Sequence, residues 1–80
     1  MKKAYWKCPP YEGPLTRRIR KLVSHNPKRA GSDSEMRFDQ YRTGMTIQEY
    51  IEACEGLNVP NYALSDINWD LERRFISLYD

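Results

Sequence analysis

The sequence predicts a small α+β domain of three helices with a short β-sheet that includes the C-terminal strand. Two Ser/Thr-x-x-Glu patterns, each before a segment with helical apolar spacing, predict two of the helices. A β-branched and aromatic run over residues 75–79 predicts a strand, which needs a pairing partner. A chain of 80 residues suits one modest core, so we expect a single compact domain over residues 15–80, preceded by an N-terminal arm over residues 1–14.

The arm is expected to be irregular. Prolines at positions 9, 10 and 14 remove backbone donors and interrupt helices, although a short edge strand over residues 3–8 is an alternative. Its aromatic residues could stack on unpaired bases or fold back over the small core: Tyr5, Trp6 and Tyr11.

Residues 15–23 carry apolar side chains at helical spacing. Positions i, i+4, i+7 and i+8 are taken by Leu15, Ile19, Leu22 and Val23. We therefore expect a helix, and a strand over residues 19–23 is the alternative that so short a run leaves open. The element ends near Asn26, because a residue before proline is pushed out of the helical region.

The first capping pattern runs from Ser32 to Glu35 and predicts a helix over residues 33–43. In a capping box the serine hydroxyl accepts the amide of the glutamate, and the glutamate carboxylate reaches back. Gly44 is expected to close this helix in a left-handed conformation.

The second capping pattern, Thr46 to Glu49, predicts a helix over residues 47–55 that stops at Gly56. Its apolar stripe has the spacing i, i+3, i+4 and i+7 and consists of Ile47, Tyr50, Ile51 and Cys54. Cys54 is therefore expected in the core.

The last third predicts a helix over residues 62–72 and then the C-terminal strand. Leu64, Ile67 and Leu71 keep helical spacing. A hairpin that joins residues 67–70 to residues 75–78 is the competing interpretation.

Size and residue content disfavour an enzyme. So short a chain leaves little stability for a deep active site. His25 is the only histidine, and no glycine-rich phosphate loop occurs. Acid pairs such as Glu49 and Glu52 are more typical of a solvated helix face.

A cytoplasmic location is expected, since no stretch has the apolar length of a signal peptide or a membrane span. Cys8 and Cys54 are then expected to be free thiols. With one histidine and no Cys-x-x-Cys, no metal site and no other cofactor is expected.

Charge is unevenly distributed along the chain. Residues 1–31 hold nine Lys/Arg and one acid, a net +8, whereas residues 32–80 hold four Lys/Arg and ten acids, a net −6. This asymmetry predicts a positive surface on the first third, unless the two parts neutralise each other within the fold. A positive surface favours the nucleic-acid backbone as partner.

Six residues are the candidate nucleic-acid contacts: Arg17, Arg18, Arg20, Lys21, Lys28 and Arg29. The first four lie off the predicted apolar helical stripe and are expected to be exposed. The last two lie on a turn directly before the helix N-terminus at Ser32, where free amides favour a phosphate. The alternative is a plain surface turn whose serine only caps the helix.

Several short motifs resemble small uncharacterised proteins of bacteria and their phages: Asn26-Pro27-Lys28-Arg29-x-Gly31-Ser32, Arg37-Phe38-x-x-Tyr41, Gly44-Met45-Thr46, Glu49, Trp69-Asp70 and Phe75-Ile76. The resemblance covers residues 19–79. It implies that the stretch before the Asn-Pro-Lys-Arg turn is a strand paired with the final strand, in a winged-helix-like layout. Arg74 stands where this pattern has glycine, which puts a tight turn there in doubt. No activity comes with the resemblance.

Two functions of different classes follow. The first is a small nucleic-acid-binding protein, of regulatory or other role, that binds phosphates with its basic third. The second is a phage or mobile-element protein that binds and inhibits a host protein through its acidic or aromatic surface. Neither involves a membrane or a small-molecule substrate, and the sequence leaves the oligomeric state open.

Overall fold

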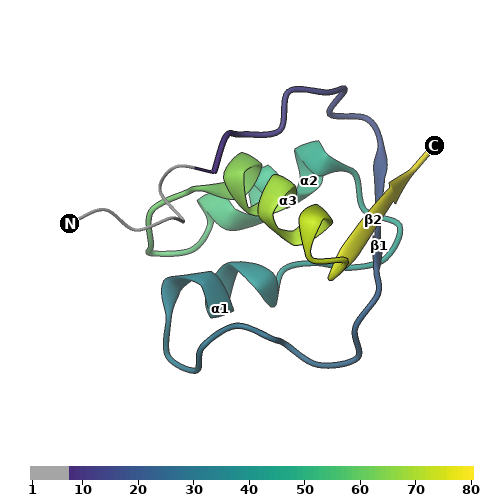
Figure 1. Cartoon of the computed structure of the whole chain (residues 1–80). Helices are drawn as coiled ribbons and strands as arrows, with labels where there is room; N and C mark the ends of the chain where they lie inside the picture. Colours follow the sequence, from purple (N-terminus) through teal and green to yellow (C-terminus); the bar gives the residue numbers. More distant parts are fainter. Residues whose placement is uncertain (1–7) are drawn as a thin grey trace.

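A computed structural model describes residues 8–80, and these form three helices and a two-stranded antiparallel sheet (Figure 1). The elements in chain order are β1 (Arg18–Lys21), α1 (Asp33–Phe38), α2 (Ile47–Glu55), α3 (Ala63–Glu72) and β2 (Ile76–Tyr79). The predicted α+β class with three helices and a C-terminal strand in a small sheet is confirmed. No helix within residues 8–80 has the length and apolar character needed to cross a bilayer.

Within the segment predicted as a helix over residues 15–23, Arg18–Lys21 form a strand, so the helix prediction is wrong. The alternative, a strand over residues 19–23, is correct in type, although the strand begins one residue earlier and ends two residues earlier. β1 pairs with β2 with Arg18 opposite Tyr79 and Lys21 opposite Ile76. On its other side β1 exchanges backbone hydrogen bonds with residues 44–47. Backbone pairing on both sides outweighs the local helical spacing, which four apolar residues support only weakly.

Helix α1 begins as predicted but ends at Phe38, five residues before the expected end. Its capping box is shifted: the Ser32 hydroxyl accepts the Glu35 amide, but the Glu35 carboxylate accepts from the amide of Gly31 instead of Ser32. Gly44 has the expected positive φ of 101°, yet it sits in the turn beside β1 and does not close the helix. The chain leaves the helix early because residues 44–47 must run along β1.

Helix α2 has the predicted bounds, and both hydrogen bonds of the Thr46 to Glu49 capping box form. Helix α3 is also confirmed, and the competing hairpin through residues 67–70 is not adopted. The side chain of Tyr62, the residue before α3, makes no capping hydrogen bond. The side-chain oxygen of Asn61 accepts a hydrogen bond from the amide of Ala63 at 3.0 Å instead. Helices α2 and α3 thus form where the local sequence signals predict them.

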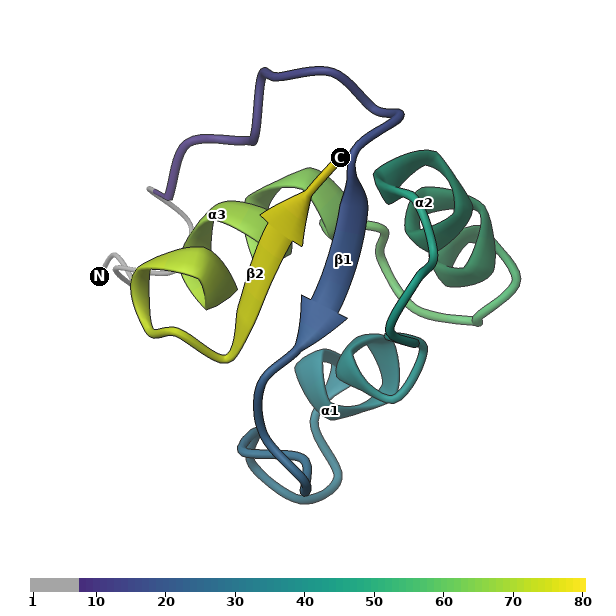
Figure 2. The same cartoon turned by 90° about the vertical axis from the view of Figure 1, so that its right-hand side faces the viewer.

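The core lies between the sheet and the three helices. Figure 2 shows the helices arranged around the two-stranded sheet. Every helix and strand contributes buried hydrophobic residues to it, as does the chain just after α1: Ile19, Phe38, Tyr41, Ile47, Tyr50, Cys54, Ala63, Ile67 and Ile76. The predicted core position of Cys54 is confirmed. The rings of Tyr41 and Tyr50 stack with centroids 4.2 Å apart.

Residues 8–14 contain no helix or strand, but they are attached to the domain. The amide of Tyr11 donates to the carbonyl of Leu64 at 3.0 Å, and the Tyr11 side chain packs against the core as the folding-back alternative predicts. The suggested strand over residues 3–8 and the roles of Tyr5 and Trp6 lie outside the described residues, save for Cys8.

The turn between α3 and β2 forms with Arg74 in the left-handed region, at a φ of 61°. The tight turn that the missing glycine put in doubt is therefore present.

A non-glycine residue such as Arg74 costs about 1 kcal/mol in this left-handed conformation. We expect Arg74→Gly to raise the free energy of unfolding by about 0.5–1 kcal/mol in urea denaturation, and Arg73→Gly, at a residue with negative φ, to lower it.

Candidate functional site

The structure divides the six predicted contact residues among four environments. Arg18 and Arg20 lie on the outward face of β1, whereas Lys21 and Arg17, the residue directly before β1, lie on the inward side. In the 26–32 turn, Lys28 points inward and Arg29 is exposed. The expected single basic surface is therefore split.

The outward pair is Arg18 and Arg20, both exposed. Residues opposite each other in an antiparallel pair share a face, so the register adds Tyr79 and Ser77 to this face. We call these four residues the outer ribbon face. The guanidinium of Arg18 donates to the carbonyl of Gly44 at 2.6 Å, and that of Arg20 lies 4.7 Å from the centre of the Tyr79 ring.

The inward pair is Arg17 and Lys21, both partly buried on the side of Ile19. Arg17 forms an ion pair with Asp80 at 3.0 Å, and Lys21 lies 5.6 Å from the centre of the Phe38 ring. The prediction that all four cations of residues 17–21 are exposed is wrong. Side chains alternate between the two faces of an extended chain, whereas the expected helix would have kept all four off its apolar stripe.

Lys28 does not form the predicted exposed phosphate grip. Its ammonium lies 2.7 Å from a carboxylate oxygen of Asp70 on α3, and the side chains are only 10% and 1% exposed. The ammonium also lies near the rings of Phe38 and Phe75, at 5.7 and 5.6 Å from their centres. The turn folds onto α3 and brings Lys28 inward, so this cation neutralises a buried carboxylate.

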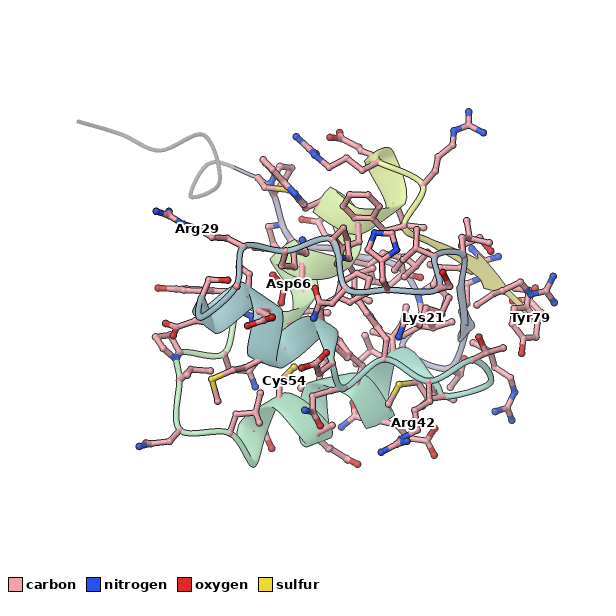
Figure 3. All side chains as sticks on the ribbon, turned by 90° about the horizontal axis from the view of Figure 1, so that it is seen from below. Lys21, Arg29, Arg42, Cys54, Asp66 and Tyr79 are labelled. Atoms are coloured by element: carbon pink, nitrogen blue, oxygen red, sulfur yellow. The ribbon has the colours of Figure 1, made fainter. Side chains whose placement is uncertain are left out.

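Arg29, the next residue, remains exposed. In Figure 3 it projects at one end of the molecule, and Tyr79 of the outer ribbon face projects at the other. Arg29 and the outer ribbon face therefore belong to separate parts of the surface.

Arg42 is an exposed cation that the sequence analysis did not single out. It lies in the turn whose next residue, Thr43, accepts the amide of Lys21 at 2.9 Å, so it is held close to β1 (Figure 3). In the sequence, Arg42 belongs to residues 32–80, the part of the chain with net negative charge. Only the pairing of residues 44–47 with β1 brings it near the ribbon.

A buried network of charged groups also went unpredicted. Arg37 is 1% exposed and binds Asp66 through both carboxylate oxygens, at 2.6 and 3.4 Å. The same guanidinium donates to the carbonyl of Pro60 at 2.9 Å, and Tyr50 donates its hydroxyl to Asp66 at 3.1 Å. Because Arg37 and Asp66 are 29 residues apart on different helices, no local pattern marks them as a pair.

The second half of the network centres on Asp70, which accepts from Lys28 and, at 2.7 Å, from the hydroxyl of Tyr41. The stacked rings of Tyr41 and Tyr50 connect the two halves. Within residues 8–80 no buried side-chain nitrogen or oxygen lacks a hydrogen-bond partner. A network so fully satisfied holds α1, α3 and the turn in one arrangement.

Burial raises the pKa of three weak acids in this region. It raises the pKa of the Cys54 thiol to about 11 and the pKa values of the Tyr41 and Tyr50 hydroxyls above their usual range. Burial is also the main cause of a raised pKa for Asp70, which Lys28 opposes. No three His, Cys, Asp or Glu side chains of residues 8–80 gather where they could hold a metal ion.

These shifts predict alkaline destabilisation. Above about pH 9 the unfolded chain releases the thiol and phenol protons that the folded chain keeps, so the free energy of unfolding falls as pH rises toward 11. Urea denaturation from pH 7 to 11 measures this decline. Cys54→Ala should make it shallower, and an unchanged slope would contradict the assignment to Cys54.

No protein-family model matches the chain, and no curated protein or solved structure matches it either.

Proposed function

We propose that this protein binds the phosphate backbone of nucleic acid through the outer ribbon face. The observation that carries the proposal is the pair of exposed arginines, Arg18 and Arg20, on one face of β1. Residues two apart in a strand are about 6.6 Å apart, so two guanidinium groups point to the same side. Guanidinium groups present several donors that match phosphate oxygens.

Neighbouring residues support the same surface. Arg42 adds a third exposed cation near the ribbon, and Tyr79 supplies an aromatic ring beneath Arg20. In the winged-helix-like arrangement that we also propose, the ribbon formed by β1 and β2 is the wing that contacts the backbone.

Weak sequence preference is part of the proposal. A helix that reads bases in the major groove should not be ringed with carboxylates, and α2 exposes Glu49, Glu52 and Glu55. That acidic face favours the second candidate, in which a basic surface of a host protein docks on α2.

The test is fluorescence polarisation with labelled duplex and single-stranded oligonucleotides at two salt concentrations. We expect Arg18→Ala/Arg20→Ala to weaken duplex binding by at least about tenfold and to lower the salt slope by about 1.8, since each lost phosphate contact removes about 0.9. The control Arg29→Ala/Arg73→Ala removes the same charge from two exposed residues that are not part of the outer ribbon face.

Equal losses in the two double variants would show a diffuse charge effect and refute the assignment to this face. No binding by the wild-type protein at low salt would refute the nucleic-acid proposal. In that case Glu49→Gln/Glu52→Gln in a pull-down against basic host proteins tests the second candidate.

A further inference from the structure

The outer ribbon face carries an aromatic ring beside both of its arginines. Tyr79 lies opposite Arg18 in the register, and Arg20 lies opposite Ser77, two positions before Tyr79. Diagonal neighbours of this kind are close enough for a ring and a long side chain to touch. The Arg20 guanidinium lies over the Tyr79 ring, 4.7 Å from its centre. We call this ring and guanidinium the Tyr79/Arg20 stack.

The fold makes little use of the Tyr79 side chain. The hydroxyls of Tyr41 and Tyr50 donate to buried carboxylates, whereas the Tyr79 hydroxyl forms no hydrogen bond with residues 8–80. Tyr79 is only partly buried and is not among the described side chains that form the core or pack against it. In Figure 3 it projects from the end of the molecule. The stack is therefore in a position to meet a ligand.

Two guanidinium groups beside a ring suit a ligand that combines negative charge with a planar group. Unpaired bases of nucleic acid stack on tyrosine rings and on guanidinium planes, and their phosphates accept from the donors at the guanidinium edge. In a duplex the bases stack on one another and offer no free face to a ring outside. Charge alone therefore fits either form of nucleic acid, but the ring fits a single strand.

We infer that the Tyr79/Arg20 stack takes up an unpaired base of single-stranded nucleic acid, while Arg18 and the edge of Arg20 bind the neighbouring phosphates. The inference rests on the proposed function of the outer ribbon face and deepens it by naming the class of ligand. The Arg18 guanidinium is held by the carbonyl of Gly44 at 2.6 Å, and its remaining N–H groups can still donate to a phosphate. Duplexes bind the same arginines through phosphates but gain nothing from the ring.

The test compares three ligands by fluorescence polarisation: a dT strand of about 12 nucleotides, an abasic strand of equal length and charge, and a hairpin duplex. The wild-type protein should bind the dT strand about tenfold more tightly than the abasic strand, since one stacked base contributes a factor of this order. The two strands carry the same phosphates, so the difference isolates the bases.

Tyr79→Leu should weaken binding of the dT strand about tenfold and leave binding of the abasic strand and the duplex within about twofold. The salt slope should stay unchanged, because stacking releases no counterions. Tyr79→Phe keeps the ring and is the matched control, expected to bind as the wild type does. If Tyr79 only orients Arg20, Tyr79→Leu weakens all three ligands alike, which would overturn the inference.

The base and phosphate groups invoked are common to DNA and RNA. An rU strand of the same length is therefore a further probe, and Tyr79→Leu should weaken its binding about as much as that of the dT strand, about tenfold. A loss confined to one of the two strands assigns the stack to that nucleic acid.

Equal binding of the dT and abasic strands by the wild-type protein would also overturn the inference, while leaving the phosphate contacts of the proposed function in place. Absence of binding to every ligand at low salt refutes the proposed function itself. Circular dichroism checks that Tyr79→Leu folds. If it does not, wild-type NMR decides: the ring signals of Tyr79 must shift with the dT strand and not with the abasic strand, and any other result excludes the stack.

Discussion

Arg37→Met is expected to lower the free energy of unfolding by about 3–5 kcal/mol at pH 7. The substitution keeps the length of the side chain but removes the cation, leaving the Asp66 carboxylate, 3% exposed, without its counter-charge. A domain of this size has a total stability of about 4–12 kcal/mol, so the loss is a large fraction of it. Urea denaturation followed by circular dichroism measures it.

The matched control is the double variant Arg37→Met/Asp66→Leu. Removing both charges abolishes the uncompensated carboxylate, so the double variant should recover part of the loss, although the Tyr50 hydroxyl then lacks its acceptor. A surface substitution of similar size, Arg42→Met, should change stability by less than about 0.5 kcal/mol. A loss in Arg37→Met no larger than in Arg42→Met would contradict the importance of the buried pair.

Lys28→Met is the second large effect, again about 3–5 kcal/mol at pH 7, because it breaks the buried pair with Asp70. Arg29→Met, one residue further along the chain and exposed, should have little effect. The two neighbours thus separate a structural cation from a surface cation. Lys28→Met should lose duplex binding only in proportion to its unfolded fraction.

The loss in Lys28→Met should depend on pH. Burial already raises the pKa of Asp70, and removing Lys28 raises it further. A carboxyl whose folded pKa is raised stabilises the folded state below its unfolded pKa and loses that contribution as pH rises through the folded pKa. The difference between Lys28→Met and wild type should therefore shrink as pH falls from 7 toward about 4. Lys28→Met/Asp70→Asn should show no such shrinkage, and a pH-independent difference in the single variant would count against this account.

The sequence by itself determined the α+β class, helices α2 and α3, the N-terminal end of α1 and the core position of Cys54. These features depend on interactions between residues a few positions apart: a capping hydroxyl and an amide three residues on, or apolar side chains one helical turn apart. The spacing of Thr46, Glu49 and the apolar residues of α2 is sufficient to predict such interactions.

Only the tertiary structure decided that Arg18–Lys21 is a strand, that α1 ends at Phe38 and that Lys28 lies inside while Arg29 lies outside. Each outcome depends on a partner far along the chain: β2 for β1, residues 44–47 beside it, and Asp70 for Lys28. The sequence lists the charges but not their neighbours. Whether an arginine or lysine faces solvent or a buried carboxylate is set by long-range packing, because the cost of burying a charge is met only where a counter-charge arrives in space.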